Sequence, residues 1–224
     1  MIDPTFHIAT PRLYLSPLDP SNESHMDYYE RLKNSPEILA VEAQSGAKPR
    51  AEPLTKSAAR LVLEGNMDRL EKTGTGRYII SLRNRDLTFT EQPPSEREYI
   101  GTVSMQLQRY PEIVCPSIPD VGFALLSAYY GRGYASEACT ALMRYFNETK
   151  GMERFAGFTH PENVASQKLF ARLGFENRGV RDVVGVLGGD GAAVRVAVWV
   201  KGVPEDVDLA SLNIGSRAGG SVVG

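Results

Sequence analysis

The chain has 224 residues, with 25 lysines and arginines against 27 aspartates and glutamates, so its formal net charge is -2 at pH 7. This length is enough to bury a core in one domain, or in one domain with extra arms. Because acidic and basic residues are mixed along the sequence, no basic face is expected, and nucleic acid is not predicted as the main partner.

Signals for secretion, membrane insertion and metal binding are missing from the sequence. No run approaches the about 18 apolar residues of a membrane span, and the first residues lack the pattern of a signal peptide. The two cysteines, Cys115 and Cys139, match no metal-ligand spacing and form no disulfide framework. We therefore expect a cytoplasmic protein with no bound metal and no membrane contact.

Helical and extended patterns alternate in the first part of the chain. Arg12–Leu15 is a strand candidate, and a helix is predicted from Ser24 to Asn34, with Ser24 as its N-cap. Residues 42–53 show no periodicity and are predicted to form a loop. Helical spacing of apolar residues resumes at Thr55 and stops at Gly74–Gly76.

The next part has the character of a β-sheet. Arg77–Arg83 and Tyr99–Gln108 are predicted as two antiparallel strands. Asn84–Arg97, which carries charges and a Pro-Pro pair, is predicted as a long excursion of the hairpin between them. Val121–Leu126 is a third apolar run.

The remaining elements complete a βαβ unit and a terminal hairpin. The predicted elements are a helix over 136–150, a strand over 155–159, a helix over 164–173 and strands over 178–187 and 192–200, joined by the turn Gly188–Gly191. Residues 204–224 are rich in Gly, Ser and acids and are predicted to be a mobile extension. We therefore expect one domain over 1–203, including the 84–97 excursion, and an extension over 204–224.

A glycine-rich turn before the 136–150 helix is the most informative segment. Residues 130–138 read YGRGYASEA. Glycines let the backbone approach a ligand closely, and a helix N-terminus offers unpaired N–H groups to an anion such as a phosphate. The pattern is neither a P-loop nor a full GxGxxG fingerprint, and a tight turn without a ligand is the alternative.

A second motif lies downstream, where residues 160–175 read HPENVASQKLFARLGF. This segment resembles the NxxSxxLxxxxGF segment of GNAT acetyltransferases, especially the branch that resembles ribosomal-protein-alanine acetyltransferases. The YGRGYASEA loop resembles the acetyl-CoA pyrophosphate loop of that branch, and DVGF at 120–123 resembles the start of the fourth strand of the family. Order and spacing agree over roughly residues 10–200.

The resemblance implies an α/β fold of the GNAT type, a mixed, mostly antiparallel twisted sheet with helices on both faces and splayed parallel central strands. It also implies acetyl-CoA as co-substrate. The residues that it assigns to acetyl-CoA binding are Phe123, Ala124, Leu125, Gly131, Arg132, Gly133, Tyr134, Ala135, Ser136, Asn163 and Phe170. For Arg132 a solvated loop position remains open, and for Asn163 an ordinary helix cap.

The resemblance also suggests two catalytic residues. Asp120 stands where several GNAT enzymes carry a glutamate base, which acts directly or through water, although its shorter side chain also suits a turn residue. Ser166 matches a serine proposed as general acid in the related branch, whereas other groups use a tyrosine where this chain has Phe170. A serine that simply faces the gap between strands is the alternative.

Together these features predict an N-acetyltransferase that moves an acetyl group directly to a primary amine in a ternary complex. The acceptor, a small amine or a protein N-terminus, is left open, as is the choice between a monomer and a homodimer. A catalytically silent acetyl-CoA-binding or sensor module is the alternative from another class, because binding and chemistry are separable. Use of a longer acyl-CoA is a third possibility.

Overall fold

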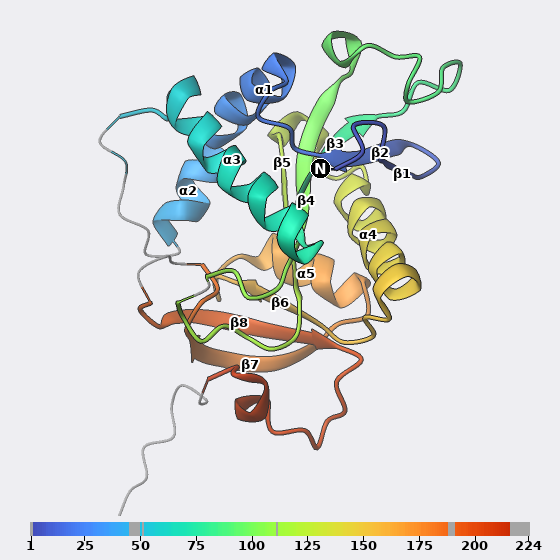
Figure 1. Cartoon of the computed structure of the whole chain (residues 1–224). Coiled ribbons are helices and arrows are strands. Elements are labelled where there is room, and N and C mark those ends of the chain that lie inside the picture. The colour runs from blue at the N-terminus through green and yellow to red at the C-terminus, as the bar shows by residue number, and fades with distance from the viewer. Residues whose placement is uncertain (1, 45–49, 51, 111, 188–190, 216–224) are drawn as a thin grey trace, which may run out of the picture. The chain divides into compact units, whose positions relative to one another are not determined.

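The computed structural model describes residues 2–44, 50, 52–110, 112–187 and 191–215 (Figure 1). Within these residues eight strands form one mixed sheet in the order β1-β2-β3-β4-β5-β6-β8-β7. The chain divides into two compact units. The first unit comprises residues 1–40, 49–105 and 122–151, and the second comprises 41–48, 106–121 and 152–224.

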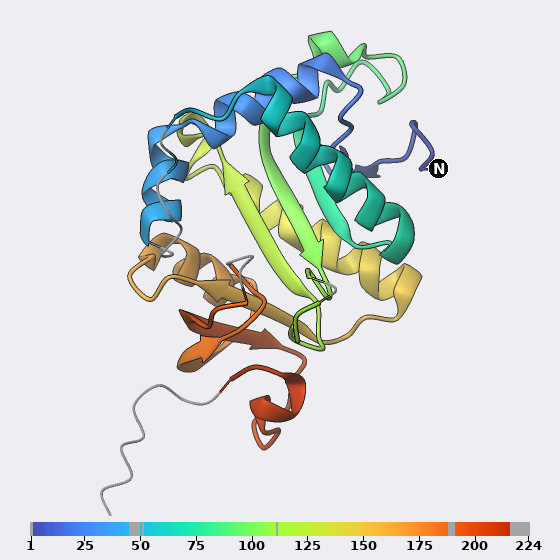
Figure 2. The ribbon, with the colours of Figure 1, turned by 60° about the vertical axis from the view of Figure 1, so that its left-hand side comes forward.

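Antiparallel strands form the sheet of the first unit. They are β1 (Ile8–Ala9), β2 (Leu13–Pro17), β3 (Gly76–Leu82) and β4 (Tyr99–Gln106). Helices α1 (Glu23–Lys33) and α3 (Lys56–Thr73) cover one face, and α4 (Tyr134–Lys150) lies on the other (Figure 2). Met26, Leu32, Leu63 and Ile79 belong to the core cluster that joins the first two helices to the sheet.

Local capping explains where these helices begin and end. The Asn22 side chain, and not Ser24 as predicted, caps α1, since it accepts from the N–H groups of Ser24 and His25. An Asn side chain satisfies such first-turn donors as well as Ser does. Thr55 caps α3 by accepting from the Ala58 N–H.

The loop predicted over 42–53 is wrong in its first residues, because α2 runs from Pro36 to Gln44. Proline suits the first turn of a helix, where its missing N–H has no partner to lose. Leu39 and Val41 are 41% and 43% exposed. The helix therefore buries no regular apolar stripe, and periodicity did not reveal it.

The second unit contains its own strands, helix and core. Its elements are β6 (Phe155–Thr159), α5 (Val164–Arg172), β7 (Glu176–Val183) and β8 (Val194–Lys201). Strand β5 (Asp120–Leu125) begins in this unit and continues in the first. Its parallel pairing with β6 aligns Asp120 with Ala156, whose N–H donates to the Pro119 carbonyl at 2.8 Å.

Residues 204–215 of the predicted 204–224 extension are described by the structure, and part of this stretch is folded and buried. A short 3-10 helix, η3 (Leu209–Leu212), follows an Asp208 cap. Leu209 is 2% exposed and Ile214 is fully buried, and both join the core cluster of the second unit. A few spaced apolar residues thus anchor a segment whose overall composition is polar.

Most predicted elements are confirmed, and their predicted bounds lie within two or three residues of the observed ones. The 84–97 excursion joins antiparallel neighbours and contains η1 (Pro94–Glu96), and η2 (Ser127–Tyr129) follows β5. The predicted turn at Gly188–Gly191 falls largely outside the described residues.

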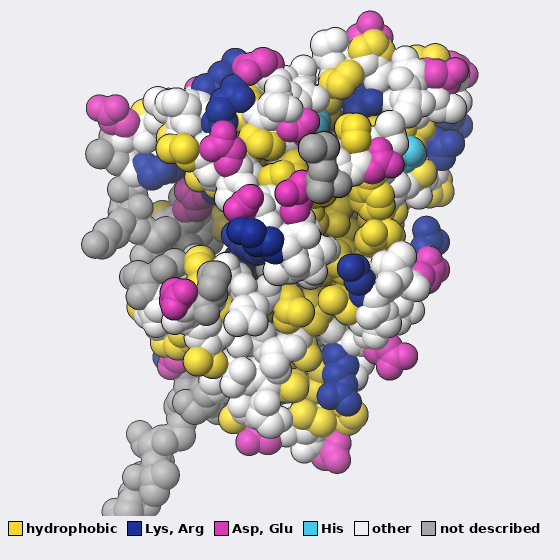
Figure 3. Space-filling view, in the orientation of Figure 1, with side chains coloured by type: hydrophobic (Ala, Val, Ile, Leu, Met, Phe, Trp, Pro, Cys, Tyr) yellow, Lys and Arg dark blue, Asp and Glu magenta, His cyan; other side chains and the backbone are white. Residues whose placement is uncertain are grey.

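No helix in the described ranges is both long and apolar enough to cross a membrane. Acidic and basic side chains are interspersed on the face in Figure 3.

Candidate functional site

The predicted phosphate loop lies between η2 and the first turn of α4. Gly133 is the N-cap of α4, with φ of +79°, and no side chain caps the helix there. The N–H groups of Tyr134, Ala135 and Ser136 have no hydrogen-bond acceptor in the part of the chain that the structure describes. Gly131 has open space where a Cβ would stand. Unpaired N–H groups at a helix N-terminus form a ready site for an anion.

Arg12, directly before β2, holds this loop through contacts with three residues, and we call the Arg12–Glu137 pair the brace. Its Nε donates to Glu137 Oε2 at 2.6 Å, and its Nη1 donates to the Arg132 carbonyl at 3.0 Å. The guanidinium lies 4.6 Å from the centroid of the Tyr134 ring. One side chain therefore contacts the turn, the first helical residue and the first-turn carboxylate.

Glu137 is the carboxylate partner of Arg12 in this brace. Its carboxylate also accepts from Thr10 Oγ1 at 2.6 Å and from the Arg12 N–H at 3.0 Å. Burial alone would raise the pKa of Glu137, but the hydrogen bonds from Thr10 and Arg12 outweigh it and lower that pKa. The carboxylate stays ionised, and a negative charge in the first turn suits the helix dipole. Sequence reasoning missed this network, because Arg12 and Glu137 are separated by 125 residues.

The other predicted positions of the first unit lie on β5 and in the loop after it. Phe123 and Ala124 are half-buried and Leu125 is buried. Arg132 is exposed, with its guanidinium 5.8 Å from the Tyr129 ring centroid. The exposed position keeps both a solvated role and a phosphate contact open for Arg132.

In the second unit Asp120 is buried and paired. Arg109 NH2 donates to Asp120 Oδ2 at 2.6 Å, and the two side chains are 18% and 12% exposed. Burial alone would lower the pKa of Arg109, but the Asp120 carboxylate raises it above its ordinary value. The guanidinium in turn favours the ionised form of the carboxylate. Arg109 was not predicted, because its loop gives no sequence signal for the pairing.

Helix α5 carries the remaining predicted residues. Asn163 caps it, with Oδ1 accepting from the Ser166 N–H at 3.0 Å, so the capping alternative for Asn163 is present in the structure. The Ser166 side chain is half-buried. The Phe170 ring is 1% exposed and stacks on Trp199 with centroids 6.2 Å apart.

The predicted residues thus gather in two groups. The first unit brings Phe123–Leu125 and Gly131–Ser136 onto one strand–turn–helix segment, and the second unit holds Asp120, Asn163, Ser166 and Phe170. Within the described residues no cluster of three His, Cys, Asp or Glu side chains is placed to hold a metal ion.

Comparisons with known proteins agree on one family. The Acetyltransferase (GNAT) domain family matches residues 12–176. The [ribosomal protein uS5]-alanine N-acetyltransferase of Escherichia coli is 33% identical over 88 residues, which are 38% of this chain and 43% of that protein. The match thus spans less than half of the length of that curated relative.

Solved structures share the fold. The acetyltransferase of Salmonella typhimurium that modifies the N-terminal serine of ribosomal protein L7/L12 has a TM-score of 0.63 and 17% identity, over 89% of this chain and 100% of that one. The microcin C7 self-immunity acetyltransferase MccE, in complex with acetyl-CoA and AMP, has a TM-score of 0.62 and 17% identity, over 87% and 94%.

Proposed function

Because the chain belongs to the GNAT acetyltransferase family, we propose that it is an N-acetyltransferase that transfers the acetyl group of acetyl-CoA to the N-terminal amine of a protein or peptide. The observation that carries the proposal is the uncapped N-terminus of α4 behind Gly133, with its unpaired N–H groups. These residues fit the pyrophosphate of acetyl-CoA, because backbone donors and the helix dipole both favour an anion there. The uS5-alanine acetyltransferase relative supports an N-terminal amine as acceptor.

The residues of the first unit bind and orient. Gly131–Ser136 hold the phosphates through backbone N–H groups, and Phe123–Leu125 offer the backbone of β5 to the amide groups of the pantetheine arm. Arg12 positions the loop, since it contacts Arg132, Tyr134 and Glu137 but leaves the first N–H groups of the helix free for the phosphates. Orientation of two bound reactants accounts for much of the rate enhancement in such a direct transfer.

Bound acetyl-CoA supplies an acyl group activated as a thioester. As the C–N bond forms and the C–S bond breaks, Asp120 receives the proton of the amine through water, and Ser166 donates a hydrogen bond to the departing sulfur. The Arg109 contact keeps Asp120 ionised and able to accept. Burial raises the pKa of Cys139 to about 12, which disfavours this thiol as an acyl carrier.

Calorimetry with acetyl-CoA tests the cofactor site. In Gly133→Asp a carboxylate occupies the anion position, so we expect the affinity to fall by at least about tenfold, since one charge contact here corresponds to about 1.4 kcal/mol. Gly151→Asp is the matched control. It stands at the other end of α4 with a similar φ of +64° and open space for a side chain, and it makes the same change in charge.

Equal loss of affinity in both variants would contradict the assignment, because it would reflect damage to the helix and not to the anion site. Release of CoA in the presence of peptides with free N-termini then separates an enzyme from a module that only binds acetyl-CoA. The proposal places the enzyme in the cytoplasm, in keeping with the free thiols of Cys115 and Cys139.

A further inference from the structure

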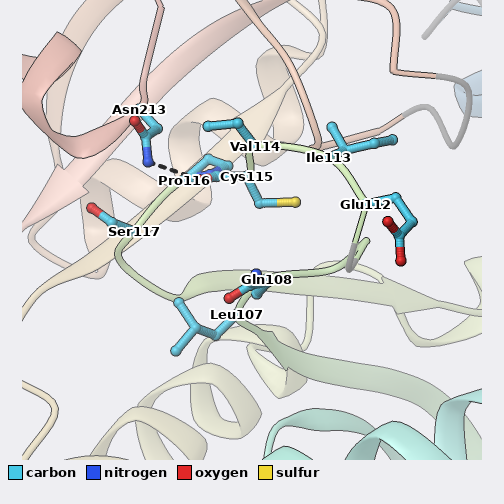
Figure 4. Close-up of a pocket in the computed structure, with 9 residues that line it drawn as sticks. All are labelled: Leu107, Gln108, Glu112, Ile113, Val114, Cys115, Pro116, Ser117 and Asn213. Atoms are coloured by element: carbon cyan, nitrogen blue, oxygen red, sulfur yellow. Dashed lines mark hydrogen bonds between the residues drawn. The ribbon is translucent and has the colours of Figure 1, made fainter.

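A pocket of about 520 Å³ is lined entirely by residues of the second unit (Figure 4). The connection between β4 and β5 forms most of its wall, and Asn213 from the C-terminal segment completes it. The family match ends at residue 176, so Asn213 belongs to a part of the chain outside that match.

The walls of this pocket contain unusual backbone. Among the described residues two that are not glycine have positive φ, Gln108 at 47° and Asn213 at 57°, and both line the pocket. A left-handed conformation is sterically unfavourable for a residue with a Cβ, less so for Asn, which at position 213 ends the short helix η3. Such conformations persist where surrounding contacts hold them, and they cluster at ligand sites.

Contacts between the two wall segments hold this shape. The Asn213 side chain donates to the Cys115 carbonyl at 3.3 Å, and the Ser117 N–H donates to the Leu212 carbonyl at 3.0 Å. The C-terminal segment is itself fixed by the buried Leu209 and Ile214. The pocket is therefore a built feature of the second unit.

Its lining combines one negative charge with apolar surface. Glu112 is exposed and forms no hydrogen bond or ion pair with the residues that the structure describes. Val114 is 69% exposed, and Ile113 lies between these two residues in the chain. In Figure 4 the Cys115 thiol points toward the side of the pocket that Ile113 and Glu112 border. Glu112 is the one charged residue among the described residues that line the pocket, and Arg109, which follows Gln108 in the chain, is paired with Asp120 at 2.6 Å, so a ligand meets an unbalanced carboxylate.

The same connection leads to the proposed reaction centre. Arg109 directly follows the pocket residue Gln108, and its guanidinium binds Asp120, which the proposed function places at the proton of the attacking amine. We propose that this pocket binds the acceptor peptide beyond its reacting amine, with Glu112 recognising a basic side chain beside an apolar one. This inference rests on the proposed function and names its substrate class, a basic N-terminal peptide.

The test compares two amidated peptides, ALKAGY and ALEAGY, in a CoA-release assay at saturating acetyl-CoA. We expect kcat/KM to favour ALKAGY by roughly tenfold, because one peptide pairs with the carboxylate and the other is repelled by it. Glu112→Gln abolishes this preference and Glu112→Lys reverses it, while KM for acetyl-CoA stays unchanged. Asp206→Lys, the same change in charge at an exposed position outside the pocket, keeps the preference.

Fluorescence anisotropy of the same peptides, labelled at the C-terminus, measures binding without turnover. If both peptides are acetylated equally, or if Glu112→Lys keeps the preference for ALKAGY, the inference is overturned and the proposed function stands. If acetyl-CoA binds but neither peptide binds or reacts, the inference is overturned together with the proposed acceptor. Loss of acetyl-CoA binding by the unmodified chain would count against the proposed function itself.

Discussion

The Asp120→Asn substitution leaves Arg109 buried without its carboxylate partner. Removal of one member of a buried ion pair costs about 3–5 kcal/mol, because the remaining charge has lost its compensation. The Arg109 side chain is 18% exposed, and its Nε is buried without a hydrogen-bond partner among the described residues. Partial exposure places the cost near the lower limit, at about 3 kcal/mol, or a fall in Tm of about 6–12 °C for a protein of this size.

The double variant Arg109→Met/Asp120→Asn removes both charges and separates stability from chemistry. Replacement of a buried pair by groups of similar volume is often close to neutral. We therefore expect its Tm to lie within a few degrees of that of the unmodified protein. If Asp120 accepts the proton of the amine, however, both the single and the double variant lose about 10²–10⁴-fold in kcat.

Arg109→Met alone completes the cycle. It keeps the carboxylate but removes the positive charge that favours its ionised form, so the acid limb of the pH–rate profile moves to higher pH. Differential scanning fluorimetry and a thiol-reactive assay of CoA release measure both properties on the same samples. Recovery of full activity in the double variant would refute a catalytic role and leave Asp120 as a structural partner of Arg109.

Three further substitutions test the electrostatics and packing described above. Glu137→Gln weakens the contacts of Arg12 around the phosphate loop, so calorimetry at pH 7 should show acetyl-CoA affinity reduced about threefold to tenfold. The difference from the unmodified protein should vanish as the pH falls below the lowered pKa of Glu137, because Glu137 is then uncharged as well. Burial lowers the pKa of His25 from 6.5 to about 4. Between these pH values the unfolded chain therefore binds more protons than the folded protein. The free energy of unfolding should fall by up to about 3 kcal/mol on acidification from pH 6.5 to 4. Denaturant titrations of His25→Gln should lack that slope, and an equal slope would contradict the assignment. Phe170→Ala removes a ring from the core of the second unit and should lower the free energy of unfolding by about 3–5 kcal/mol in the same titrations.

The sequence predicted those features of the candidate site that depend on consecutive residues. The strand–turn–helix segment around Gly133 and the capped helix after Asn163 depend on backbone conformations that a few neighbouring residues decide. Family membership, the fold class and most element bounds are confirmed on the same basis. The roles of the acetyl-CoA-binding residues, like those of Asp120 and Ser166, remain predictions.

What the sequence did not predict depends on contacts between distant segments. The Arg12–Glu137 brace joins residues 125 positions apart, and the charge that faces Asp120 comes from a loop without periodicity. The order of the C-terminal segment depends on Leu209 and Ile214 finding a core formed by other strands. Single charged or apolar residues in polar surroundings carry no local signal of such partners.

Phe170 connects the packing of the second unit to its proposed chemistry. Its ring is so close to β6 that a Cβ on Gly157 would lie 2.3 Å from Cε1, and it also meets Phe175 with centroids 5.2 Å apart. The ring fixes the C-terminal half of α5, while the Asn163 cap fixes its first turn through the Ser166 N–H. Position 170 carries no exchangeable proton, and the donor that the family resemblance predicts on this helix is Ser166 in its first turn. Ser166 is half-buried, and the cap of Asn163 and the packing of Phe170 fix the helix that carries it, while its role as a donor stays a prediction.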